Sequence, residues 1–222
     1  MGLATFFPSL LTTTKGFDLV SLMIRYIVLI ICCLITPHAI ASAKIVVLGD
    51  SISAGFGIKQ KESWASLLQL KLNKEKYAYQ VINASISGDT SSGGLLRIDN
   101  ILTRETPAIV IIELGGNDGL RGLKLKTVKQ NLKDIIEKCH THGAKTLLVG
   151  MQLPPNYGLA YTTQFSKIFT SLAHEKQIPV VPFIFEGIES NMKYFQQDGI
   201  HPTAEAQSIL LNNIWPQLKP ML

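Results

Sequence analysis

The chain has 222 residues, of which 46% are hydrophobic and 17% are charged. This composition excludes an intrinsically disordered chain and a collagen-like or low-complexity repeat, because it supplies enough apolar side chains for a sizeable core. Lys and Arg number 21 against 16 Asp and Glu, which gives a net charge of +5. Without a run of neighbouring basic residues, this charge gives no indication of a nucleic acid partner.

The first element that the sequence predicts is a secretory signal peptide. The apolar run Tyr26–Ile35 follows Arg25 and precedes a stretch of small residues, Ala39–Ala43. A basic flank, a short apolar core and a small-residue cleavage site are typical of a signal peptide, and this run is too short to cross a bilayer. We therefore expect an exported protein, periplasmic or secreted, with an uncleaved N-terminal anchor as the alternative.

The same pattern predicts the domain boundaries. Cleavage after Ala41 and cleavage after Ala43 both satisfy the small-residue rule. Met23 would begin a compact basic region before the apolar run, so we suspect that it is the true start. We expect residues 1–41 to be a signal peptide and residues 42–222 to form a single domain without stable membrane insertion.

Beyond the signal peptide, apolar strands alternate with helices. The expected elements are the strand Ile45–Leu48, the helix Trp64–Leu72, the strand Tyr79–Ala84, the helix Ser91–Leu102, the strand Ala108–Leu114, the helix Thr127–His142, the strand Thr146–Gly150, the helix Gln164–Lys176, the short strand Pro179–Pro182 and the helix Thr203–Leu218. Strands that alternate in this way predict an α/β fold, a three-layer αβα sandwich with a five-stranded parallel sheet.

Polar segments follow the predicted strands. Gly49–Ser51 comes after the first strand, Ser85–Asp89 after the second and Gly115–Asp118 after the third, and Asp198–Pro202 precedes the last helix. In open parallel sheets, ligands bind outside the carboxyl ends of the strands. These four segments are therefore the candidate functional site.

Three of these residues suit nucleophilic catalysis. Ser51 directly follows a buried strand where the chain must turn, and Gly49 would give that turn its backbone freedom. Taken alone, Ser51 is more simply a turn or N-cap residue. A nucleophilic serine needs a base and an acid that orients the base. His201 stands three residues after Asp198, so that one short loop can present the carboxylate to one nitrogen of the imidazole ring.

Acyl transfer also needs hydrogen-bond donors for the oxyanion. A backbone amide at Gly88 and the side chain of Asn117 follow the second and third strands. Taken alone, Gly88 is more simply a turn residue and Asn117 is more simply a loop cap. Their coincidence with Ser51, Asp198 and His201 at one edge of the sheet favours a catalytic site.

The four segments resemble the sequence blocks of the SGNH, or GDSL-type, hydrolase family. Further segments resemble the secreted bacterial thioesterase and arylesterase members of that family, and the likeness covers about residues 42–220. These further segments are Asn83–Ser91, Gly119–Gly122, Asn156–Gly158 and Gln197–Pro202. The resemblance implies a flavodoxin-like αβα fold.

The resemblance also implies a function. The family members hydrolyse small-molecule acyl esters and thioesters, with thioesterase, lysophospholipase and arylesterase activities, through an acyl-enzyme intermediate. By that likeness Ser51 is the nucleophile, His201 the general base and Asp198 its partner, and the oxyanion hole comes from the amides of Ser51 and Gly88 and the side chain of Asn117. An acyltransferase or carbohydrate deacetylase on the same scaffold remains an alternative, as does an inactive lipid-binding protein.

Two loops are candidates for binding the acyl group. They follow the third and fourth strands, and Gly119 and Gly122 would let the first of them move as a flap. Their apolar residues, which we expect to line a channel, are Leu120, Leu123, Leu153, Pro154 and Tyr157. The alternative is that these are surface loops with scattered apolar residues.

The sequence gives no indication of a cofactor or metal. The segment that begins at Gly55 starts like a dinucleotide fingerprint but lacks its third glycine, and Asn83 stands where a ribose-binding acid would be needed. The acidic residues and His201 lack the paired-histidine spacing of a hydrolytic metal site. Cys139 is the one cysteine after the signal peptide, and we expect a buried, inert thiol in a monomer.

Overall fold

The computed structural model describes residues 21–26 and 42–222. Residues 21–26 form a short helix, and Ser42–Leu222 form a separate compact unit. Most of the predicted signal peptide and its cleavage sites lie outside the described residues, so the boundary at residue 41 stays a prediction. Within the two described ranges, no helix has the length and apolar character needed to cross a membrane.

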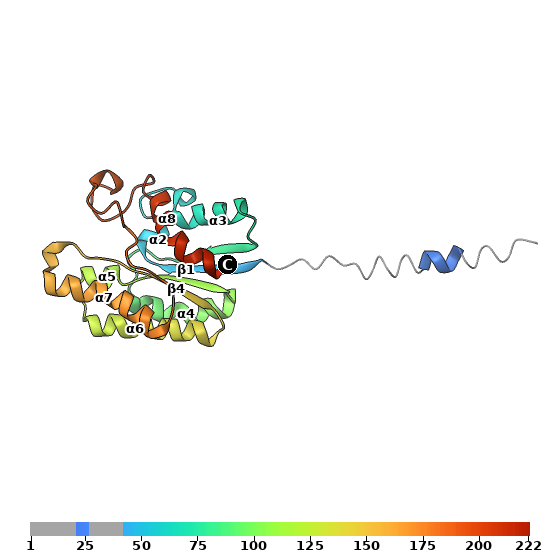
Figure 1. Cartoon of the computed structure of the whole chain (residues 1–222), viewed down its shortest axis with the longest axis horizontal. Coiled ribbons are helices and arrows are strands. Elements are labelled where there is room, and N and C mark those ends of the chain that lie inside the picture. The colour runs from blue at the N-terminus through green and yellow to red at the C-terminus, as the bar shows by residue number, and fades with distance from the viewer. Residues whose placement is uncertain (1–20, 27–41) are drawn as a thin grey trace, which may run out of the picture. The chain divides into compact units, whose positions relative to one another are not determined.

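Five parallel strands form one sheet in the order β2-β1-β3-β4-β5 (Figure 1). The strands are β1 (Ala43–Gly49), β2 (Tyr79–Asn83), β3 (Ile109–Glu113), β4 (Lys145–Val149) and β5 (Val180–Val181). The central strands are continuous apolar runs because helices cover both faces of a parallel sheet. Ile45 of β1 lies opposite Val81 of β2 and Ile109 of β3.

The helices form the two outer layers. In Figure 1, α3 and α8 cover one face of the sheet, and α4, α6 and α7 cover the other. Their bounds are α3 (Trp64–Lys74), α8 (Gln207–Leu218), α4 (Ser91–Glu105), α6 (Leu125–Thr141) and α7 (Leu159–Lys176). The predicted three-layer αβα sandwich with a five-stranded parallel sheet is therefore confirmed.

Several shorter helices were not predicted from the sequence. They are α2 (Ser51–Ala54), α5 (Gly116–Leu120), η1 (Gln60–Glu62), η2 (Pro155–Tyr157), η3 (Met192–Tyr194) and η4 (Lys219–Met221). Too short to carry an apolar periodicity, they leave no helical pattern in the sequence. Two of them, α2 and α5, begin at the carboxyl ends of β1 and β3.

The last helix begins later than expected. The sequence predicts a helix from Thr203, but α8 begins at Gln207. The Thr203 N–H donates to the Tyr194 carbonyl, and the Ala206 N–H donates to the Thr203 carbonyl across a three-residue turn. Those bonds hold residues 203–206 in turns, so His201 lies in a loop well before the helix. In contrast, α7 begins five residues earlier than predicted, at Leu159 rather than Gln164.

Cys139 lies in the core of the fold, as expected. Its thiol is free and lies on the buried face of α6. Burial raises the pKa of the Cys139 thiol to about 12, which keeps it protonated and unreactive.

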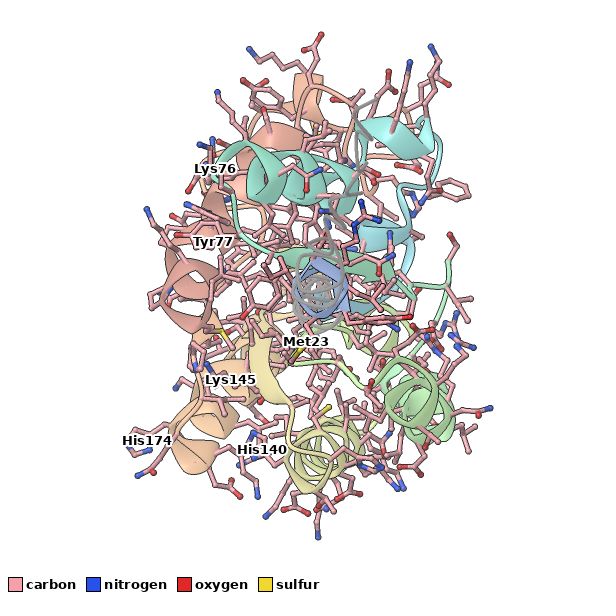
Figure 2. The ribbon with its side chains drawn as sticks, turned by 90° about the vertical axis from the view of Figure 1, so that its right-hand side faces the viewer. Met23, Lys76, Tyr77, His140, Lys145 and His174 are labelled. Carbon is pink, nitrogen blue, oxygen red and sulfur yellow. The ribbon has the colours of Figure 1, made fainter. Side chains whose placement is uncertain are left out.

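The strand order places the site at a switch point. From β1 the chain crosses to β2 on one side and from β3 to β4 on the other, so the segments after β1 and β3 diverge and leave a crevice between them. Ser51 follows β1 and Asn117 follows β3. Figure 2 views the opposite edge, where Tyr77 precedes β2 and Lys145 begins β4.

Candidate active site

Ser51 is the first residue of the short helix α2, directly after β1. The Asp50 side chain caps this helix by accepting a hydrogen bond from the Ile52 N–H at 3.0 Å. Gly49 is needed for close packing rather than for the backbone freedom that we expected. A Cβ atom at Gly49 would lie 2.7 Å from the Ser53 Cβ and 2.9 Å from a Glu113 carboxylate oxygen.

The Ser51 hydroxyl lies against His201, and His201 lies against Asp198. The Ser51 Oγ is 2.9 Å from the His201 Nε2, and the His201 Nδ1 is 2.7 Å from the Asp198 Oδ2. An ionised carboxylate can only accept, so the Nδ1 carries a proton and the Nε2 is left to accept from the serine. This is the order of bonds that a nucleophile, a base and an orienting acid require.

Asp198 is held as an anion by its own loop. Its Oδ1 accepts from the backbone N–H groups of Ile200 and His201, at 2.9 and 3.0 Å. These bonds, together with the His201 side chain, lower the pKa of Asp198 to about 2. Asp198 therefore keeps its negative charge at any pH at which histidine titrates.

Two residues that the sequence analysis did not single out connect the His201 loop to the Ser51 loop. The ring of Phe56 lies 4.5 Å from the His201 ring, centroid to centroid. The Gln196 side chain donates to the carbonyls of Phe56 and Pro202, at 2.8 and 3.1 Å. His201 is thus held in place by the segment that follows Ser51 as well as by Asp198.

The three expected oxyanion donors lie on segments that hydrogen bonds connect. Among the described residues, neither the Ser51 N–H nor the Gly88 N–H has an acceptor. The Asn117 Nδ2 donates to the Asp50 Oδ2 at 3.0 Å and to the Asp89 carbonyl at 2.9 Å. Both amide hydrogens of Asn117 are therefore engaged, and one must be shared or redirected to reach a substrate oxygen.

A pair of buried carboxyl groups lies beneath Ser51. Glu113, at the end of β3, accepts from the Ser53 Oγ at 2.7 Å, and the Trp64 Nε1 donates to that same hydroxyl at 3.2 Å. Burial raises the pKa of Asp50 to about 6, and burial together with the nearby Asp50 raises the pKa of Glu113 well above its usual range. The one sequence signal for Glu113 is an acidic residue that ends an otherwise apolar strand.

The expected acyl-binding residues have different environments. Leu153 is buried and Leu120 half-buried, whereas Leu123 and Pro154 are exposed. The half-buried Tyr157 donates its hydroxyl to the Leu120 carbonyl at 2.8 Å, so the two loops are in contact.

The segment that follows β3, which we expected to move as a flap, makes close contacts with its neighbours. Gly119 lies inside α5, where a Cβ atom would come within 2.7 Å of Leu153 and 2.8 Å of Phe165. The Tyr161 hydroxyl also donates to the Leu123 carbonyl at 2.9 Å. Gly119 therefore serves close packing, and Gly122, with a φ of +67°, is the glycine of this segment that needs backbone freedom.

Across residues 21–26 and 42–222, no group of three or more His, Cys, Asp or Glu side chains could hold a metal ion. A hollow of about 450 Å³ lies at the opposite edge of the sheet, lined in part by His140 and Lys145 (Figure 2). It is remote from Ser51.

A serine, a histidine and an aspartate joined by hydrogen bonds at the carboxyl edge of a parallel sheet are the arrangement of a serine-type ester hydrolase. The family model described as the GDSL-like Lipase/Acylhydrolase family matches residues 47–209. The chain belongs to this family, and it is an esterase or thioesterase as its relatives are. The resemblance that the sequence blocks indicated is confirmed.

Characterised relatives match nearly the whole chain. It is 50% identical to Esterase TesA of Pseudomonas aeruginosa over 85% of this chain and 94% of that protein. It is 39% identical to the Thioesterase 1/protease 1/lysophospholipase L1 of Escherichia coli (strain K12), over 85% of this chain and 89% of that one.

Solved structures share the fold. The crystal structure of TesA matches 81% of this chain and 99% of its own, at 50% identity and a TM-score of 0.79. A structure of the psychrotrophic esterase EstA from Pseudoalteromonas sp., inhibited by monoethylphosphonate, has 37% identity and a TM-score of 0.76. It covers 80% of this chain and 97% of its own.

Proposed function

We propose that this protein is an exported serine hydrolase that cleaves acyl esters and thioesters through an acyl-enzyme intermediate. In this proposal Ser51 is the nucleophile, His201 the general base and Asp198 the residue that orients the base. The observation that carries the proposal is the chain of two hydrogen bonds, 2.9 and 2.7 Å long, from Ser51 through His201 to Asp198.

The reaction begins with acylation. The Ser51 Oγ attacks the carbonyl carbon of the substrate while the His201 Nε2 takes the hydroxyl proton. The tetrahedral intermediate then collapses, and the leaving alcohol or thiol receives that proton from His201. A water molecule, deprotonated by His201, next attacks the acyl-Ser51 ester. The second tetrahedral intermediate collapses as His201 returns the proton to the Ser51 Oγ, and the carboxylic acid is released. Asp198 stays ionised throughout and stabilises the imidazolium.

The oxyanion is assigned to three donors in this proposal. The free N–H groups of Ser51 and Gly88 are available without breaking any bond among the described residues. The Asn117 side chain supplies the third donor when one of its hydrogens is shared between the Asp89 carbonyl and the substrate oxygen. Donors aimed at the position of the developing charge provide a large share of the rate in acyl transfer.

The substrate class follows from this chemistry and from the relatives. Oxygen esters and thioesters pass through the same tetrahedral intermediate, and the similar proteins are named esterase, thioesterase and lysophospholipase. We assign the walls of the acyl-binding channel to the two loops that Tyr157 connects. The five residues proposed to line it are Leu120, Leu123, Leu153, Pro154 and Tyr157.

Export follows from the N-terminal segment. Residues 1–41 carry the basic flank, apolar run and small residues of a signal peptide, so the mature protein would begin near residue 42 and comprise one domain. The mass of the protein isolated outside the cytoplasm gives the cleavage site, and a full-length mass would contradict cleavage.

A covalent label tests both the nucleophile and the channel. We expect p-nitrophenyl alkylphosphonates to release one nitrophenolate per chain and to leave a phosphonate on Ser51, which peptide mass spectrometry locates. Each added methylene of the alkyl group is expected to raise the labelling rate by up to about fourfold until the channel ends, because it buries more apolar surface. Labelling elsewhere would contradict the nucleophile, and rates that fall from the methyl compound onward would contradict the channel.

Activity is expected to rise from pH 4 to neutral pH. His201 must be neutral to accept the serine proton, and Asp198, with a pKa of about 2, is already ionised over this range. Ionisation of Asp50, whose pKa burial raises to about 6, acts in the same direction because its carboxylate fixes Asn117. The measurement is kcat/KM for a p-nitrophenyl ester across this range, and a flat or falling profile would contradict the assignment of the base.

A further inference from the structure

The proposed oxyanion hole includes the loop around Gly88. A turn bond from the Asp89 N–H to the Ile86 carbonyl, 3.1 Å long, and a bond from the Arg121 Nη2 to the Gly88 carbonyl, 3.0 Å long, hold this loop. Gly88 is exposed, and its φ of +78° lies in the left-handed region. Its N–H can stabilise an oxyanion only if it is fixed in position before the substrate arrives. Arg121 is exposed, so its bond holds the loop only weakly, and a buried side chain outside the loop would add rigidity.

Arg97, on the second turn of α4, contacts this loop and two strand ends. Its Nε and Nη2 both lie 2.8 Å from the Asp89 Oδ2. Its Nη1 donates to the Ala84 carbonyl just beyond β2, and its Nη2 reaches the Gly49 carbonyl at the end of β1 at 3.4 Å. One guanidinium group thus joins the segment before Ser51 to the residue after Gly88.

Asp89 connects Arg97 to another proposed donor, Asn117, and to the start of α4. Its Oδ1 accepts from the Thr90 N–H at 2.9 Å, at the start of α4, and its carbonyl accepts from the Asn117 Nδ2 at 2.9 Å. The Arg97–Asp89 ion pair is largely buried, with 20% and 10% of the two side chains exposed. Such a pair holds its geometry better than an exposed one.

Arg97 also affects the charge around the oxyanion. Asp50 adjoins Ser51 and Asp89 adjoins Gly88 in the chain, so their carboxylates lie beside proposed donors and disfavour a further negative charge there. The guanidinium neutralises Asp89, which adjoins two of the three proposed donors. Arginine suits this task because its planar fork can donate to a carboxylate and to carbonyl oxygens at the same time.

We propose that Arg97 is a positioning residue for the oxyanion hole, which it organises through Asp89. The proposal rests on the proposed function, because it assigns Arg97 a role only if Gly88 and Asn117 stabilise the oxyanion. Among the described residues, the hydrogen bonds of Arg97 reach Asp89, Ala84 and Gly49, and none reaches Ser51 or His201. It acts on kcat by fixing the donors, whereas a brace that only stabilises the fold would act on the melting temperature.

The test compares Arg97→Met and Arg97→Lys with the parent. Arg97→Met is expected to lower kcat by about 10- to 100-fold, the scale of a misplaced catalytic group, with KM changed less than about threefold. Arg97→Lys keeps the charge but not the fork, and we expect kcat to stay at least about fivefold below the parent. Arg104→Met is the matched control, since this exposed arginine lies at the end of the same helix and should leave kcat unchanged.

A double-mutant cycle with Asn117→Ala separates positioning from stability. If Arg97 acts through the donors, Arg97→Met will cost at least about threefold less kcat in the Asn117→Ala background than in the parent. Equal losses in both backgrounds, or a kcat within about threefold of the parent in the single variant, would overturn the proposal. If Arg97→Met does not fold, Asp89→Asn removes the same ion pair with little change in shape and is read in the same cycle.

These outcomes are distinct from failure of the proposed function. If phosphonates do not label Ser51, the proposed nucleophile is wrong whatever the Arg97 variants do. If Ser51 is labelled in the parent but Arg97→Met is labelled at the parental rate, the nucleophile stands and the positioning role of Arg97 is wrong.

Discussion

Replacing Ser51 with alanine is expected to abolish ester hydrolysis almost completely, with a loss in kcat on the order of 10³-fold or more. The substitution removes the attacking oxygen and the proton that His201 accepts, and no other group at the site replaces them. It deletes a single oxygen from the first residue of α2, so the core volume does not change. The free N–H of residue 51 also stays in place.

The measurement is kcat for a short p-nitrophenyl ester, with circular dichroism and the melting temperature to show that the fold is intact. Ser92→Ala is the control, because Ser92 is an exposed serine at the start of α4. Retention of more than about a tenth of the parental kcat by a folded Ser51→Ala protein would remove Ser51 from the mechanism.

Asn117→Ala is expected to lower kcat by about 10²- to 10³-fold while the triad stays intact. The variant loses one of three proposed donors, and it also leaves the Asp50 carboxylate and the Asp89 carbonyl without the hydrogens that Asn117 gives them. KM should change far less than kcat, because the donor is needed for the oxyanion and not for the ground-state ester.

The control for this variant is Asn131→Ala. Asn131 is a half-buried asparagine whose side chain donates to the Ser91 Oγ at 3.0 Å, on α6 rather than beside Ser51. It should cost stability but not kcat. An Asn117→Ala protein with the parental kcat would show that Asn117 only connects Asp50 to Asp89 and is not an oxyanion donor.

The fold could be predicted because its main signals are local. The apolar run of β3 and the apolar positions of α6 read correctly from the sequence, since each element shows its own periodicity. The start of α8 could not be read in this way. Residues 203–206 have a helix-compatible sequence, but a bond between the Thr203 N–H and the Tyr194 carbonyl holds them in turns, and that contact is not visible in the local pattern.

Residues of the candidate site could be predicted where their side-chain type suits a known chemical role. They could not be predicted where only a tertiary contact brings them to the site. Ser51, Asp198 and His201 have side chains that nucleophilic catalysis requires, and the structure brings them into hydrogen-bond distance. Phe56 and Arg97 are ordinary residues in the sequence. They gain importance only because folding lays Phe56 against His201 and Arg97 across the ends of β1 and β2.

The buried carboxyl groups under Ser51 make the free energy of unfolding depend on pH. A carboxyl group whose pKa is raised on folding binds more protons in the native chain than in the unfolded one, so its contribution to stability falls as the pH rises. For Asp50 the loss runs from its ordinary pKa of 3.8 to about 6, and Glu113 extends it upward. Above that range, where both carboxyl groups are ionised in the unfolded chain, they oppose folding the most. The proposed nucleophile therefore lies above a part of the core that mild acid would make more stable.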